Sequence, residues 1–313
     1  NMELKKVDFP VVPNAPPPPP LRNEIPLHQG KNLMKSAASL IGKKDDKIER
    51  EFAVNICQNF LQRYKVDDDN MSWFYRNNDV EAFLQDGPTC GLVALKLAAD
   101  ILKISPSKSS YEIEDLLKVA QENGFTYHGE MFSAKDMGLL AKKYYELKFT
   151  VVNDGLENYV QLIKHLCKGF PLLVPYDADR NHEPCLKRGQ KAHWAVITGF
   201  LIGIKDDSIS LADTSTVEKD TSIHPFHFDK VQDPMLLESR HLFFLARQGK
   251  SRHYGVWCWS NLNSSNKNLL EFDQGQTSTS EKSKCIFTEG VQKGLCSKVV
   301  LLFPQDKTDS NIV

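Results

Sequence analysis

The spacing of the apolar residues changes near residue 170, and this change limits the folds open to the chain. Before it, apolar residues recur every three or four positions, which is typical of helices. One such set is Leu92, Leu95, Ala98, Ala99 and Leu102. After it, short apolar runs between polar turns indicate strands, at 171–175, 193–202, 208–212, 241–246, 254–259 and 298–303. This order favours an α+β domain, with a helical half followed by an antiparallel β-sheet half.

Composition divides the 313 residues into an arm, a domain and a tail. Eight of the 16 prolines fall at or before Pro26, so we expect residues 1–45 to be a disordered, proline-rich arm and linker. Residues 46–304 form the predicted domain. Within it, residues 261–284 are rich in Ser, Asn, Thr and Gln, which predicts a long mobile loop. Residues 305–313 are expected to be a disordered tail.

Charge and cysteine content argue against several classes of function. The net charge of −1 argues against binding to nucleic acid or to an anionic membrane. No apolar run approaches the roughly 20 residues that span a bilayer, and the proline-rich start lacks the apolar core of a signal peptide. Seven scattered cysteines without a CxxC pair suit a reducing compartment, so we expect a cytoplasmic protein with free thiols.

A zinc site is the main alternative chemistry, and its candidate ligands would be His182, Cys185, His224 and His227. Zinc accepts His and Cys ligands. The two pairs lie about 40 residues apart, in loops with no second thiol pair. We therefore expect no metal site.

The segment Gln85-Asp86-Gly87-Pro88-Thr89-Cys90-Gly91-Leu92 runs straight into an apolar helix. Gly87 and Pro88 break the preceding structure and Thr89 can cap the helix, which places Cys90 on the first turn. Free backbone N–H groups and the helix dipole favour a thiolate there, and a thiolate attacks carbonyl carbons. The alternative is a buried structural cysteine.

His193 opens an apolar strand, and Asp213 ends the strand expected to pair with it across a turn at 205–207. This hairpin would bring the carboxylate to the imidazole, fix its tautomer and stabilise the imidazolium. Cys90 is then the candidate nucleophile, His193 the general base and Asp213 the orienting residue. Gln85 and the Cys90 backbone N–H would form an oxyanion hole. Each residue alone is more often structural; their order and element types together favour catalysis.

Three segments carry a family resemblance: Gln-Asp-Gly-Pro-Thr-Cys-Gly-Leu-Val-Ala-Leu from Gln85, His-Trp-Ala-Val-Ile-Thr-Gly from His193, and Leu-Ala-Asp ending at Asp213. They are similar to motifs of the bacteriocin-processing group of papain-like cysteine peptidases. With its proline-rich start and Arg247-Gln-Gly-Lys-Ser251, the chain resembles the actin maturation proteases more closely still. The resemblance implies a papain-like fold over most of residues 46–304, and no cofactor.

The resemblance also implies a substrate and a partner. That family removes the acetylated N-terminal Met or Cys from actin. The resemblance implies that profilin binds the proline tract and delivers actin. The tract is expected to form polyproline II, which SH3, WW and EVH1 modules also bind, and a stiff spacer is the alternative. Its residues are Pro16, Pro17, Pro18, Pro19 and Pro20.

A basic stretch just before His193 fits an acidic substrate. Mature actin N-termini are acidic, and a rim formed by Lys187, Arg188 and Lys191 would attract such a tail. The alternative is an ordinary solvated loop.

Two other functions stay open from the sequence. A related thiol hydrolase, transferase or deamidase would share Cys90 and His193 but act on another protein substrate. A non-catalytic adaptor would use only its proline-rich arm. The presence of Cys, His and Asp together argues against the adaptor.

Overall fold

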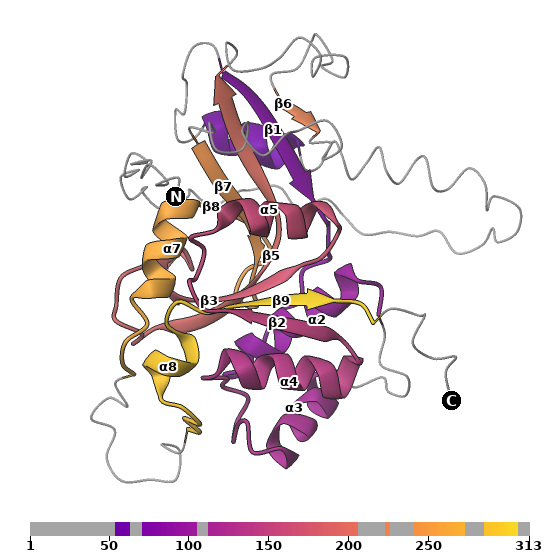
Figure 1. Ribbon diagram of the computed structural model, residues 1–313, viewed down its shortest axis with the longest axis vertical. Coiled ribbons are helices and arrows are strands. Elements are labelled where there is room, and N and C mark those ends of the chain that lie inside the picture. The colour runs from indigo at the N-terminus through magenta and orange to yellow at the C-terminus, as the bar shows by residue number, and fades with distance from the viewer. Residues whose placement is uncertain are drawn as a thin grey trace, which may run out of the picture. The chain divides into compact units, whose positions relative to one another are not determined.

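The computed structural model describes residues 54–62, 71–104, 112–205, 223–225, 241–272 and 285–305. The chain divides into two units, Val12–Asp67 and a larger unit of Asn1–Val11 with Asp68–Val313. In the smaller unit, the described residues 54–62 are helical, as the spacing of Ile56 and Phe60 predicts. All elements discussed below belong to the larger unit (Figure 1).

A nine-stranded sheet runs through the larger unit in the order β2-β9-β3-β5-β1-β6, with β4 beside β3, β7 beside β5 and β8 beside β7. Its strands are β1 (Met71–Asn77), β2 (Lys148–Val152), β3 (Leu172–Ala178), β4 (Pro184–Cys185), β5 (Ala192–Lys205), β6 (Ile223–Pro225), β7 (His241–Arg247), β8 (Gly255–Cys258) and β9 (Val299–Phe303). The described pairs are antiparallel except β1 with β6. The predicted antiparallel sheet is thus confirmed, with one parallel pair at its end.

Strand β5 connects the two ends of this sheet. Its residues 192–197 pair with β3 and residues 199–205 pair with β1, while β7 pairs from Val196 to Gly203. Because β1 and β7 both pair with residues 199–203, both edges of β5 are occupied there. The hairpin predicted from the sequence pairs residues 208–212 with the end of β5. That pairing is therefore wrong for β5 residues 199–203. Residues 206–222 themselves lie outside the described ranges.

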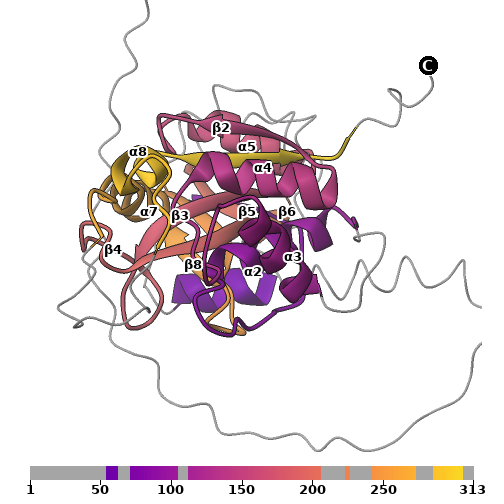
Figure 2. The same cartoon turned by 90° about the horizontal axis from the view of Figure 1, so that it is seen from below.

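Helices cover both faces of the sheet. Alternate residues of β5 point to opposite faces, as the strand period requires. Trp194 and Val196 join an apolar cluster with the helices α2, α3 and α4, whereas Ala195 and Ile197 join a second cluster with α5 and α7. The helices are α2 (Cys90–Ile101), α3 (Glu112–Glu122), α4 (Ala134–Tyr145), α5 (Tyr159–Cys167), α7 (Trp259–Lys267) and α8 (Val291–Leu295). Both views show α3 beside α4 (Figure 1, Figure 2).

Helix α2 is the most deeply buried helix of the first cluster. Eight of its residues are buried, and it packs against β5, β3, α3 and α4. Gly91 allows this close packing, because a Cβ there would lie 2.6 Å from the Met137 side chain. The N-terminus of α2 is therefore held against the sheet from several sides.

The α+β class is confirmed, but two local expectations are wrong. Strand β1 lies in the half of the chain expected to be mainly helical, where no strand at 71–77 was predicted. Helix α7 covers residues 261–267 of the predicted loop 261–284, whose residues 273–284 lie outside the described part. The arm (1–45), most of the tail (306–313) and the Pro16–Pro20 tract also lie outside it. Among the described residues, no helix is long and apolar enough to cross a membrane.

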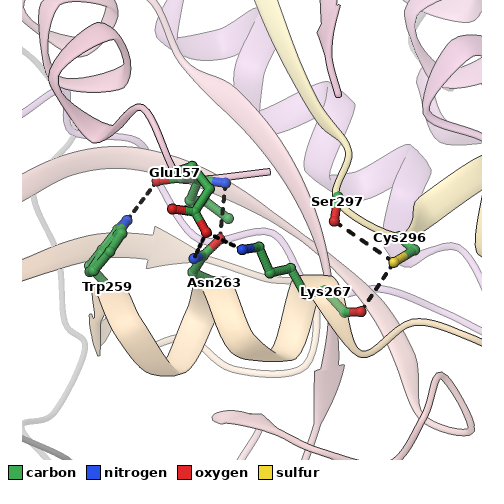
Figure 3. A network of polar contacts seen from close by, with 7 residues as sticks. Glu157, Trp259, Asn263, Lys267, Cys296 and Ser297 are labelled. Carbon is green, nitrogen blue, oxygen red and sulfur yellow. Dashed lines mark hydrogen bonds and ion pairs between the residues drawn. The ribbon is translucent and has the colours of Figure 1, made fainter. Parts of the chain in front are cut away.

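Helix α7 is held by polar contacts rather than by an apolar stripe (Figure 3). Trp259 Nε1 donates to the Leu156 carbonyl at 2.7 Å, and Asn263 Oδ1 accepts from the Leu156 N–H at 3.2 Å. Lys267 pairs with Glu157 at the end of the helix. Because Asn263, Ser265 and Asn266 make buried side-chain hydrogen bonds, the segment has the composition of a loop.

Candidate active site around Cys90 and His193

Cys90 is the first residue of α2, as predicted. Gly87 supplies the tight turn before it, with a φ of +62°. The expected cap by Thr89 is wrong: its hydroxyl donates to the Asp86 carbonyl at 2.7 Å and makes no cap bond to the helix. The helix therefore begins at the predicted position without a side-chain cap.

A tight turn at residues 126–131 fastens the start of α2 to β5. Gly129 lies so close to Thr89 that an added Cβ would come within 2.7 Å of its methyl group. Two residues further on, the Met131 carbonyl accepts a 2.8 Å hydrogen bond from Trp194 Nε1. Thr89, which precedes Cys90, is thus linked through this turn to Trp194, which follows His193.

The backbone of β5 completes the link to Cys90. Cys90 packs against the apolar cluster that contains Trp194, and the Trp194 backbone acts on the Cys90 thiol, so Cys90 lies beside the start of this strand. His193 precedes Trp194, and its imidazole is buried, with 8% of the residue exposed. The predicted nucleophile and base are therefore brought to the same place in the fold.

Three side chains surround the imidazole of His193. The Tyr176 ring meets it edge-on at 5.9 Å between centroids, and the His182 ring stacks on it at 6.5 Å. Gln248 Oε1 lies 3.4 Å from His193 Nε2. None of these three residues was predicted to contact His193, because no spacing in the sequence relates 176, 182 or 248 to 193.

Burial sets the protonation of both groups. Burial raises the pKa of the Cys90 thiol, and the opposing hydrogen bonds from the backbones of Trp194 and Gly91 are weaker. The expectation that the helix start favours a thiolate is therefore wrong in net direction. Burial likewise lowers the pKa of His193 to about 4, against an opposing contribution from the Gln248 contact. At neutral pH the free site holds a thiol and a neutral imidazole.

Gln85 lies beside this site but does not point a donor into it. Its backbone N–H donates to the Gly249 carbonyl at 2.8 Å, and its Nε2 donates to the Gly87 carbonyl at 2.7 Å. Its Oε1 is buried without a hydrogen-bond partner among the described residues. The amide donor expected at the oxyanion hole is thus used within the loop.

The basic stretch is held by a buried carboxylate. Asp177, at the end of β3, is fully buried and accepts backbone N–H bonds from Lys187, Gly189 and Lys191 at 2.8 to 3.0 Å. The side chains of Lys187 and Lys191 are exposed. Arg188 instead pairs with Glu271 at 2.7 Å. All three predicted cations therefore face solvent, and Arg188 is held there in an ion pair with Glu271.

Asp213 and His227 lie outside the described residues, as does the side chain of His224. Within those residues no group of three or more His, Cys, Asp or Glu could hold a metal ion. All seven cysteines are free thiols.

Comparisons with known proteins agree on one family. Residues 80–201 match the family model described as "Actin maturation protease-like, C-terminal domain". The chain is 39% identical to the human actin maturation protease over 242 residues, covering 76% of this chain and 68% of that protein. It is 36% identical to the Danio rerio actin maturation protease over 253 residues, covering 77% of this chain and 78% of that protein.

A solved structure also matches. It is a putative C39-like peptidase from Bacillus anthracis, with 10% sequence identity and a TM-score of 0.32. The match covers 76% of this chain and 99% of that chain.

Proposed function

The chain belongs to the actin maturation protease family, and from this premise we propose that it is a papain-like cysteine aminopeptidase. Its proposed reaction removes the N-acetylated first residue, Met or Cys, from immature actin. The observation that carries the proposal is that Cys90, at the start of a buried helix, packs against the apolar cluster that contains Trp194, the residue after His193. A thiol and an imidazole so placed are the two groups that acyl transfer requires.

The neutral pair at the site determines how the reaction begins. His193 removes the proton from Cys90 as the sulfur attacks the carbonyl carbon of the first residue. The leaving amine, which is the new N-terminus of actin, takes that proton from the imidazolium. Water, deprotonated by His193, then hydrolyses the thioester and releases the acetylated amino acid.

Two further roles follow from the sequence. Asp213 is the sequence-based candidate for orienting His193. The Cys90 backbone N–H and the Gln85 amide are the candidate oxyanion donors, and Gln85 would first have to release the Gly87 carbonyl. An oxyanion would be a stronger acceptor than that carbonyl, which favours such an exchange.

The substrate is recognised, in this proposal, at two places. Lys187 and Lys191 attract the acidic N-terminus of actin, while Arg188 fastens the loop through Glu271. The Pro16–Pro20 tract binds profilin and so brings profilin-bound actin to the enzyme in the cytoplasm.

The test compares the purified chain with its Cys90→Ala variant on an N-acetyl-Met peptide carrying the acidic actin N-terminus. Loss of the mass of one acetylated residue with the wild type alone is the expected result. Cys167→Ala is the matched control, since that thiol lies on α5 and burial raises its pKa to about 11. If Cys90→Ala cleaves as fast as the wild type, the proposed nucleophile is wrong.

The same assay separates the alternatives. A gain of one mass unit without cleavage would identify a deamidase, and a transferred acyl group would identify a transferase. Deleting residues 16–20 should slow cleavage of actin in the profilin complex and leave cleavage of the peptide unchanged. Equal rates on the complex with and without the tract would refute the profilin role.

A further inference from the structure

Gln248 contacts the catalytic candidate His193 from the end of β7, the strand that pairs with β5. It follows directly after β7 and is buried, with 5% of the residue exposed. Its Oε1 lies 3.4 Å from His193 Nε2, and the same oxygen accepts the Lys250 backbone N–H at 2.6 Å. The second bond determines which end of the amide faces the imidazole, because only the oxygen can accept from an N–H.

This orientation determines the tautomer of His193. An amide oxygen cannot donate, so the ring nitrogen that faces it must carry the hydrogen. Nε2 is then the N–H of the neutral ring, and Nδ1 keeps its lone pair. A free lone pair on Nδ1 is what a base needs to accept the Cys90 proton. The 3.4 Å separation is long, as is common before substrate binds.

We propose that Gln248 is the positioning residue for His193, holding the imidazole by its Nε2–H so that Nδ1 serves as the base. This inference rests on the proposed function. It assigns to Gln248 the orienting role for which the sequence suggested Asp213. An imidazole has two ring nitrogens, and if one serves Cys90 and the other Gln248, none is left for a carboxylate.

A neutral amide in this position also sets the charge of the site. An adjacent carboxylate would favour the imidazolium, whereas the amide adds no negative charge. The other groups near the imidazole are His182, Tyr176 and Lys250, and Cys90 lies near Tyr176 and Lys250. Burial lowers the pKa of His182 and raises that of Tyr176, so neither adds charge at neutral pH. Lys250 disfavours the imidazolium further.

The experiment measures kcat and KM for Gln248→Ala, Gln248→Glu and Asp213→Asn on the acetylated peptide. We expect Gln248→Ala to lower kcat roughly 10²-fold with KM nearly unchanged, since a misplaced base costs about that much. Gln190→Ala is the matched control, because that amide is exposed and lies three residues before His193. It should leave both constants unchanged.

Gln248→Glu tests the contact itself. The carboxylate can still accept from Nε2–H, so kcat should recover to within about 10-fold of wild type. It should also raise the pKa of His193 by about 1 unit or more, measured from the imidazole NMR signals and from the acidic limb of kcat/KM. A residue that acted only through folding would not move this titration.

Two results would overturn the inference. In one, Asp213→Asn lowers kcat roughly 10²-fold while Gln248→Ala does not. In the other, His193 titrates at the same pH in Gln248→Glu as in the wild type. The NMR titration needs no substrate, so it decides the contact even if the wild type fails to cleave the peptide. If Gln248→Ala does not fold, the titration of Gln248→Glu still tests the contact, because that variant keeps the acceptor oxygen.

Discussion

Asp177→Asn replaces a fully buried carboxylate with an amide of nearly the same shape. The carboxylate accepts three backbone N–H bonds from the loop that leads to His193. Its Oδ2 accepts from Lys187 and Gly189, and its Oδ1 accepts from Lys191. The amide can keep one oxygen, so at best two of these bonds survive, and both lose the negative charge of the acceptor.

The size of the effect follows from those three bonds. A hydrogen bond to a charged group contributes about 1.5–3 kcal/mol and a neutral one about 0.5–1.5 kcal/mol. In the variant, the new NH₂ faces the N–H of Lys191, so one buried donor is also left without an acceptor. We therefore expect Asp177→Asn to lower the free energy of unfolding by about 3 kcal/mol.

Urea unfolding at pH 7 measures this change. Asp179→Asn is the matched control: Asp179 Oδ1 accepts from the N–H groups of Asn181 and Glu183 in a partly exposed turn, where water can replace the lost acceptor. We expect the control to cost less than about 1 kcal/mol. A loss at Asp177 no larger than at Asp179 would refute the view that the buried carboxylate holds this loop.

Two further predictions concern pH and charge. Burial lowers the pKa of His165 to about 4, so the unfolded state binds its proton first as the pH falls. Protonation of His165 in the unfolded state should therefore lower the free energy of unfolding of the wild type by about 3 kcal/mol between pH 6.5 and pH 4. The His165→Gln variant should not show this loss. Lys187→Glu with Lys191→Glu should raise KM about 5-fold for an acidic peptide and not for a neutral one, because exposed charges act modestly.

Each of these two has a clear contradicting result. Urea midpoints at pH 7 and pH 4.5 that fall in parallel for wild type and His165→Gln would show that this residue carries no pH dependence. Equal rises in KM for the acidic and neutral peptides would show that the lysines act on the fold of the loop and not on substrate charge. Added salt should reduce the effect on the acidic peptide if the lysines act by charge.

Elements whose signals are local were predicted well. The pattern Ser133-Ala-Lys-Asp136 is typical of a helix N-terminus, and α4 follows it with Ser133 as its cap, whose Oγ accepts from the Asp136 N–H at 3.1 Å. Cys90 begins its helix and His193 lies at the start of its strand, as expected. Capping, helix period and strand alternation all act over a few residues, so a sequence pattern carries them.

Elements held by distant polar partners were missed. Helix α7 buries Asn263, Ser265 and Asn266, and Asn266 Nδ2 donates to the carbonyls of Pro175 and Lys298. Such side chains favour loops when their partners are not known. The partner of β5 was also misjudged, because adjacent strands were expected to pair, whereas β1 and β7 come from positions far along the chain.

The same distinction between local signals and distant contacts applies to the residues of the candidate site. Residue types and spacing were enough to single out Cys90 and His193, since the helix start and the strand start are local features. The contact of Gln248 with His193 joins residues 55 positions apart. The direction of the Cys90 pKa is likewise set by burial under distant segments, which outweighs the local helix start. Desolvation depends on everything packed around a group, so only the tertiary structure could decide it.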